Sequence, residues 1–268
     1  MERRAFLAAT TAAAVTSTDA LAGAAGAAAE PGTAARPQIL ELRRYRLRNG
    51  ALATRFAAYA KEALVPALGR AGLAPIGAWN VAMGPDSPTL HLLLPHPDAA
   101  SVVTLDARLE ADAEYRKAAA SSLVLPPADA PFLSCDSSLH AAVATMPGIE
   151  KPIGAAAGKD RLFELRTYRS ATEAASRRKI EMFEAGGELG LFRRVGLNTV
   201  FFGRDLVGPG LPSLTYMVVF ADADAREKAW AAFREHPEWV KMRDDPRYAD
   251  TVSNIDSSLL RPTDYSQI

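Results

Sequence analysis

An internal repeat constrains the fold of this 268-residue chain more than any other feature. Three motifs occur twice in the same order, about 120 residues apart: Glu-Leu-Arg-x-Tyr-Arg at 41–46 and 164–169, a Glu-aromatic pair at 114–115 and 238–239, and Asp-Ser-Ser-Leu at 136–139 and 256–259. Such a period indicates a duplicated structural unit. We therefore predict one unit at 38–142 and a second at 160–262. The proline- and glycine-containing segment 143–159 is interpreted as the linker.

Both units carry the same predicted order of elements, β-α-β-β-α-β, which is the ferredoxin-like order. In the first unit we expect strands at 39–47, 74–83, 89–94 and 132–139, and helices at 51–70 and 98–120. In the second we expect strands at 161–169, 198–206, 213–220 and 252–260, and helices at 172–195 and 222–235. Helices on one face of such a sheet leave the other face bare. The predicted fold class is therefore α+β, with two tandem ferredoxin-like units packed sheet to sheet.

The N-terminal residues have the composition of an export signal. Arg3-Arg4 is followed by Phe6-Leu7, then by an Ala- and Thr-rich apolar stretch and by the A-x-A cleavage candidates 20–22 and 27–29. This order predicts a twin-arginine-type signal peptide at 1–29, and hence a periplasmic or extracellular protein. The apolar stretch is too short and too weakly hydrophobic for a stable membrane span.

Charge and cysteine content exclude several classes of function. Lys plus Arg and Asp plus Glu are both 31, so the net charge is zero and gives no electrostatic reason to bind nucleic acid. The single cysteine, Cys135, excludes an intrachain disulfide and a site of several thiolates. The four histidines lack the spacing of a helical metal site. We expect no metal and no tightly held cofactor.

The repeated first strand supplies the principal candidate site. Because strand side chains alternate between faces, one face carries two polar triplets: Glu41, Arg43 and Tyr45, and Glu164, Arg166 and Tyr168. The leucines between them are expected to meet the helices, which would point the triplets into the space between the units. One interpretation is a buried Glu–Arg pair with a Tyr hydroxyl that holds the sheets in register. The other is a ligand pocket in which the arginines bind an anion and the tyrosines donate hydrogen bonds.

Serine, histidine and cysteine side chains supply three further candidate sites. A nucleophilic serine needs a base in reach, and no histidine is repeated beside the two Asp-Ser-Ser motifs, although His140 follows the first. Hydrogen bonding at a strand end is the favoured interpretation of these serines. His91 lies on a predicted strand and can face the interior, where a haem ligand would be needed. Cys135 is predicted to be a buried small hydrophobe.

The motifs Phe-Glu-Leu-Arg-Thr-Tyr at 163–168 and His-Pro-Glu-Trp at 236–239 resemble the NIPSNAP family. The resemblance extends over 39–260, with Glu-Tyr at 114–115 replacing the Glu-Trp of the family pattern. It implies a dimeric α+β barrel, here formed as a pseudo-dimer within one chain. The biochemical activity of the family is undefined, so the resemblance supplies no catalytic residues.

Three functions remain open from the sequence. The first is an exported NIPSNAP-like protein that binds a small molecule or a protein partner. The second is a barrel-type enzyme, either cofactor-free and monooxygenase-like or haem-dependent, with its site in the cavity between the units. An enzyme requires an enclosed pocket with a few convergent polar groups, whereas a collapsed interior filled by Glu–Arg pairs would exclude it. A third reading is a structural protein whose repeat mediates assembly, and homo-oligomers remain open.

Overall fold

The structure is a computed structural model that describes residues 36–123 and 125–268. The predicted signal peptide at 1–29 lies outside the described residues and stays a prediction. Residues 35–268 cluster as one compact unit, so the two repeats share a single body.

The described part of the first repeat has four strands and two helical segments in the predicted order. Its strands are β1 (Ile39–Leu47), β2 (Gly77–Met83), β3 (Thr89–His96) and β4 (Phe132–Ala142). Its helices are α1 (Ala51–Tyr59), a π-turn (Ala60–Leu64), α2 (Val65–Arg70), α3 (Ala99–Val103), α4 (Leu105–Ala111), α5 (Ala113–Leu123) and a 3-10 turn (Pro127–Asp129). The π-turn ends two residues before Pro66, whose missing N–H and bulky ring disturb the regular hydrogen-bond ladder of the preceding turn.

The second repeat follows the same order. Its strands are β5 (Leu162–Arg169), β6 (Asn198–Val207), β7 (Ser213–Phe220) and β8 (Asn254–Pro262). Its helices are α6 (Glu173–Phe183), α7 (Glu188–Arg194), α8 (Ala223–Glu235), α9 (Pro237–Arg243) and a 3-10 turn (Pro246–Tyr248). The helix predicted at 172–195 is two helices, because Gly187 adopts a left-handed conformation (φ 89°) between them.

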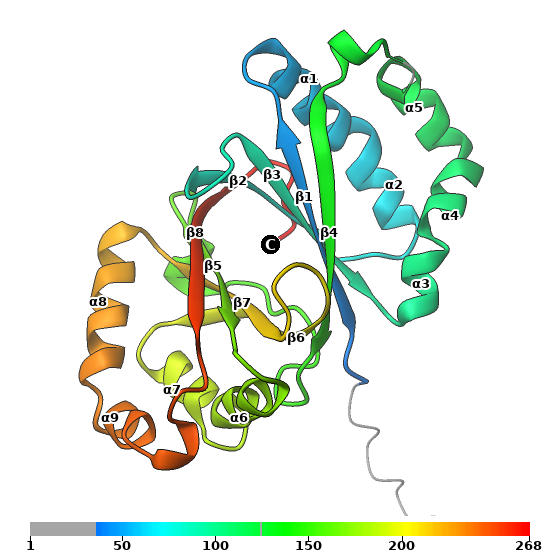
Figure 1. The fold of residues 1–268 in the computed structure, drawn as a ribbon. Helices are drawn as coiled ribbons and strands as arrows, with labels where there is room; N and C mark the ends of the chain where they lie inside the picture. The colour runs from blue at the N-terminus through cyan, green and yellow to red at the C-terminus, as the bar shows by residue number, and fades with distance from the viewer. Residues whose placement is uncertain (1–35, 124) are drawn as a thin grey trace, which may run out of the picture. The chain divides into compact units, whose positions relative to one another are not determined.

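The eight strands close into one antiparallel barrel in the order β1-β3-β2-β8-β5-β7-β6-β4. Within each repeat the outermost strands are the second and the fourth. These edges pair across the repeats, β2 with β8 and β4 with β6 (Figure 1). The predicted intramolecular α+β barrel is therefore confirmed. Closure leaves no sheet edge unpaired in the barrel.

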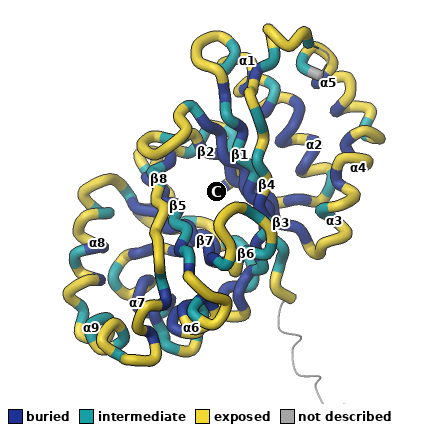
Figure 2. Tube along the Cα trace, in the orientation of Figure 1, coloured by how far each residue is buried: buried dark blue, intermediate teal, exposed yellow. Residues whose placement is uncertain are grey.

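Three apolar cores hold this architecture together. One lies between the first-repeat strands and helices α1–α5, and a second lies between the second-repeat strands and α6–α9. Figure 2 shows the helices buried towards the strands and exposed on their outer sides. The third core fills one end of the barrel interior, where the rings of Trp79 and Phe163 are 5.3 Å apart. Ala156, from the 3-10 turn at Gly154–Ala157, and the C-terminal Ile268 belong to this interior core.

The close packing around Trp79 gives a stability test. A Cβ on Gly77 would overlap the Trp79 ring, although the Gly77 backbone conformation suits any residue. We expect Gly77→Ala to lower the free energy of unfolding by about 1–3 kcal/mol through overpacking. The matched control is Gly69→Ala in α2, where an added Cβ meets nothing within 4 Å and should stabilise by about 0.5–1 kcal/mol. Urea unfolding checks both, and equal stability of the two variants would contradict this view of the interior.

Candidate functional site

The repeated Glu-Arg-Tyr face points outward, towards the helices. Tyr45 packs on Phe56 of α1, with ring centroids 4.9 Å apart, and Tyr168 packs near Phe183 of α6. Leu42 and Leu165 lie in the interior core instead. The prediction that each triplet shares one face is correct, but the prediction that this face lines the inter-unit space is wrong. Both faces of the sheet are covered, so alternation alone could not tell the inner face from the outer.

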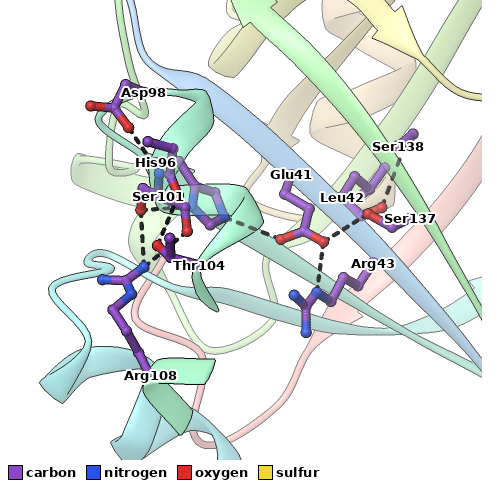
Figure 3. A network of polar contacts seen from close by, with 11 residues as sticks. Glu41, Leu42, Arg43, His96, Asp98, Ser101, Thr104, Arg108, Ser137 and Ser138 are labelled. Atoms are coloured by element: carbon purple, nitrogen blue, oxygen red, sulfur yellow. Dashed lines mark hydrogen bonds and ion pairs between the residues drawn. The ribbon is translucent and has the colours of Figure 1, made fainter. Parts of the chain in front are cut away.

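Glu41 is the centre of a buried polar network on this outer face (Figure 3). Its carboxylate accepts hydrogen bonds from Arg43 Nε at 2.7 Å and Ser137 Oγ at 2.7 Å, and contacts His96 Nε2 at 3.1 Å. Burial alone would raise the pKa of Glu41, but the hydrogen bonds and the Arg43 charge outweigh it and lower the pKa to about 2. His96 continues the network to Ser101 at 3.0 Å, which ties β1 to the start of α3.

Glu164 repeats this arrangement with different partners. It accepts hydrogen bonds from Arg166 at 2.6 Å, from Arg226 at 2.7 Å and from the Trp230 indole at 2.8 Å. Burial opposes ionisation of Glu164, yet these donors lower its pKa. The Arg166 guanidinium also stacks over the Trp230 ring at 4.8 Å. These contacts bind β5 to α8, as expected for charges that are buried only when paired.

The outer triplet of the second repeat also borders an open groove of about 560 Å³. Arg166 and Tyr168 line it together with Arg226 and Trp230 of α8. The arginines here already contact Glu164, so their hydrogen-bonding capacity is partly used. The ligand-binding role predicted for the triplets therefore stays a prediction, now placed on the outside of the barrel.

A second cavity, of about 270 Å³, lies inside the barrel. Both repeats contribute its wall, which combines polar side chains, two leucines and the loop residues Pro85, Gly208 and Pro209. The polar side chains are Arg44, Asp86, His91, Ser138, His140, Thr167, Arg169, Asp205, Thr215, Asp256, Ser257 and Ser258, and the two leucines are Leu42 and Leu165. The interior thus changes from an apolar end to a polar end, and the interior is not filled by Glu–Arg pairs.

A hydrogen-bonded chain of serine, histidine and aspartate crosses this cavity wall. Ser138 Oγ is 3.0 Å from His140 Nε2, and His140 Nδ1 is 2.7 Å from Asp205 Oδ1. Asp205 also accepts hydrogen bonds from Ser213 at 2.6 Å and Thr215 at 2.9 Å. The His140 side chain is 2% exposed and that of Asp205 is 7% exposed. This is the order of groups in which a carboxylate orients a histidine base beside a hydroxyl nucleophile.

The donor and acceptor roles in this chain follow from chemistry. An ionised carboxylate only accepts hydrogen bonds, so Nδ1 of His140 carries the proton shared with Asp205. In the neutral imidazole Nε2 is then an acceptor, and Ser138 donates its hydroxyl proton to it. The hydroxyl is therefore poised to lose its proton to the ring.

The duplication provides an internal comparison for this chain. His140 pairs with Asp205 where the two repeats meet, and the equivalent positions at the other junction are Leu260 and Val81. Leu260 is the register partner of Phe163 on β5, and His140 is the register partner of Leu40 on β1. The two positions are therefore equivalent in the two repeats. The apolar pair closes the barrel equally well, so closure does not require a buried His–Asp pair.

His91 and Arg44 lie on neighbouring strands of the same cavity wall. His91 is 5% exposed, and its Nδ1 has no hydrogen-bond partner among the described residues. Burial, with a contribution from the Arg44 charge, lowers the pKa of His91 to about 3. The carboxylate nearest Arg44 in the described ranges is that of Asp136, at 3.9 Å. The wall thus combines a neutral histidine with a weakly paired guanidinium.

Asp205 belongs to the cavity wall although no sequence pattern predicts it as a site residue. Asp205 lies on β6, in the other repeat from His140, and no local pattern links the two. Ser137 has the predicted structural hydrogen bond, whereas Ser138 on the opposite face meets His140. The prediction of a buried Cys135 is wrong, because the first part of β4 is largely exposed and Cys135 with it.

Two further features of the described part of the chain bear on function. None of its helices combines the length and the apolar character needed to cross a bilayer. No three His, Cys, Asp or Glu side chains in these ranges converge as a metal site would require.

The closed barrel with helices outside both halves defines the class of this protein, an α+β barrel built from two ferredoxin-like repeats. The NIPSNAP family profile matches residues 40–125 and 163–267, more than half of the chain. The chain belongs to the NIPSNAP family. No curated protein matches the sequence at a significant level.

Solved structures share the fold at low sequence identity. A "putative monooxygenase" from Fusobacterium nucleatum is 12% identical, with a TM-score of 0.53, and the match covers 85% of this chain and 93% of that one. A "putative monooxygenase" from Lactobacillus acidophilus is 8% identical, with a TM-score of 0.54 and coverage of 85% and 94%. An uncharacterized NIPSNAP-like domain protein from Burkholderia xenovorans is 20% identical, with a TM-score of 0.36 and coverage of 41% and 90%.

The buried neutral His91 predicts a specific pH dependence of stability. Its pKa is about 3 in the folded state and about 6.5 in the unfolded state, so the unfolded chain binds the extra proton first as pH falls. The free energy of unfolding should therefore fall below about pH 6.5, by up to about 1.4 kcal/mol per pH unit from this group. In His91→Gln this contribution should vanish. Urea unfolding from about pH 8 to 4.5 checks it, and parallel curves for both proteins below pH 6.5 would refute it.

Proposed function

We propose that the cavity inside the barrel binds a small organic molecule with an anionic or strongly polar oxygen. The observation that carries this proposal is an interior left open by about 270 Å³ and walled by polar groups of both repeats. Drug-sized ligands occupy cavities of roughly 300–1,000 Å³, so the ligand is at or below the small end of that range. The same argument leaves a large cofactor such as haem without support.

The cavity wall indicates how such a molecule would be oriented. Leu42 and Leu165 offer an apolar surface to its body. Arg44 is only loosely paired with Asp136, at 3.9 Å, and offers a charge-assisted hydrogen bond to an anionic oxygen. The unpartnered Nδ1 of His91 offers one more polar contact. A small aromatic or aliphatic carboxylate satisfies all of these groups.

A second candidate is a barrel-type enzyme with its chemistry in the same cavity. The hydrogen bond from His140 to Asp205 favours it, because an imidazole oriented by a carboxylate is a general base. The two monooxygenase-named proteins share only the fold, which is a weak reason to assign their reaction. The choice between binding and catalysis therefore depends on His140 and its neighbours.

We further propose that the protein acts outside the cytoplasm. This rests on the order of charge, apolar stretch and small-residue cleavage candidates in residues 1–29. Replacing both Arg3 and Arg4 by lysine should retain the precursor inside the cell while leaving the mature sequence unchanged. Fractionation of a host with a twin-arginine pathway checks this, and equal export of both precursors would contradict it.

Benzoate is a suitable probe of the cavity. We expect it to bind the wild type with a Kd near the millimolar range and to perturb amide signals of β1 and β3 in heteronuclear NMR spectra. Arg44→Met should weaken binding by about tenfold or more, since a hydrogen bond to a charged group contributes about 1.5–3 kcal/mol.

The matched control is Arg48→Met, which removes an exposed arginine that follows the same strand and does not line the cavity. Its affinity for benzoate should equal that of the wild type. Absence of benzoate binding by the wild type, or equal binding by Arg44→Met, would overturn the anion-binding proposal.

A further inference from the structure

We propose that Ser138 is a nucleophile activated by His140 and Asp205, so that the cavity hydrolyses small carboxylic esters. The inference rests on the proposed ligand cavity and adds a reaction to it. The three side chains come from β4 and β6, and all of them line the cavity. Ser138 is 8% exposed, and its remaining contact is a long one, 3.4 Å to the Leu42 carbonyl oxygen. The Ser138 hydroxyl therefore hydrogen-bonds mainly to His140.

The carboxylate of the Ser138–His140–Asp205 chain is held by further hydrogen bonds. Asp205 is held by Ser213 and Thr215 through the oxygen that His140 does not contact. Asp205 Oδ1 therefore remains directed at His140 Nδ1, and this hydrogen bond fixes the imidazole tautomer that a general base needs. The base is oriented before any substrate enters, which is the condition under which such groups accelerate a reaction.

Comparison of the duplicated strands indicates that packing does not require the hydrogen-bonded set of Ser138, His140 and Asp205. Ser258 occupies the position equivalent to Ser138, and a glycine approaches each serine in the same way, Gly84 and Gly208 respectively. Only the first copy has a histidine two residues further on, and Leu260 replaces it in the second. The complete set of three groups therefore occurs once in the barrel, although the backbone that carries it occurs twice.

The reaction balances without an oxidant or a metal. Ser138 Oγ attacks the ester carbonyl carbon while His140 Nε2 takes the hydroxyl proton. The bond to the alcohol oxygen breaks, and His140 returns the proton to that oxygen. Water then attacks the acyl-serine ester, passes a proton to His140, and releases the carboxylic acid as the proton returns to Ser138.

A cation is available for the charge that develops on the carbonyl oxygen. Arg44 lies on β1, which pairs with β4, and its register partner Asp136 is two residues before Ser138 on the strand. Side chains in such diagonal positions on one face lie within reach of each other when one of them is long. Arg44 can therefore stabilise an oxyanion and then bind the carboxylate product.

The test uses the mature full-length protein with p-nitrophenyl acetate and a fluorophosphonate probe. We expect esterase activity, and a covalent phosphonate adduct that peptide mass spectrometry places on Ser138. Ser138→Ala should abolish the adduct, and Ser138→Ala and His140→Gln should each reduce the hydrolysis rate about a hundredfold or more. Asp205→Asn should reduce labelling, because it favours the wrong tautomer of His140.

The matched control is Ser137→Ala, the neighbouring serine on the opposite face of β4, which should label and hydrolyse as the wild type does. A wild type that binds benzoate but shows neither hydrolysis nor an adduct on Ser138 would overturn the nucleophile and leave the ligand cavity standing. An adduct on Ser138 without benzoate binding would support the nucleophile and refute the proposed anionic ligand. Circular dichroism confirms that each variant is folded before its rate is compared.

Discussion

The pairing of β2 with β8 and of β4 with β6 is the interaction on which the rest of the structure depends. Each repeat by itself is a four-stranded sheet with two open edges and one uncovered face. The two pairings remove the edges and enclose the uncovered faces at the same time. Because they join different repeats, they also bring together side chains that are far apart in the sequence. His140 and Asp205 meet in this way.

Closure of the barrel creates an interior with two different ends. At one end the large rings of Trp79, Phe163 and Phe201 and the C-terminal Ile268 fill the space. At the other end the same strands carry polar side chains, and a cavity of about 270 Å³ remains. The change occurs along single strands, from Leu42 to Arg44 on β1 and from Leu165 to Thr167 on β5. The apolar end stabilises the barrel, and the polar end is therefore available for a functional site.

The two repeats share one polar arrangement and differ in another. Glu41 and Glu164 each connect the first strand of a repeat to its helices, with His96 as a partner in one copy and Trp230 in the other. The interior positions have diverged further: Arg44 and His91 of the first copy correspond to Thr167 and Thr215 of the second. The cavity is consequently asymmetric although its backbone is nearly symmetric.

The sequence by itself determined the repeat, the β-α-β-β-α-β order and the grouping of Glu41, Arg43 and Tyr45 on one strand face. These properties depend on local conformational preference and on the two-residue period of a strand, which a sequence displays directly. Only the tertiary structure decided which face is internal, because both faces of each sheet are buried and both need apolar residues. It alone joined Ser138 and His140 to Asp205, because that contact depends on the register between strands of different repeats, and no local pattern encodes a register across about 65 residues.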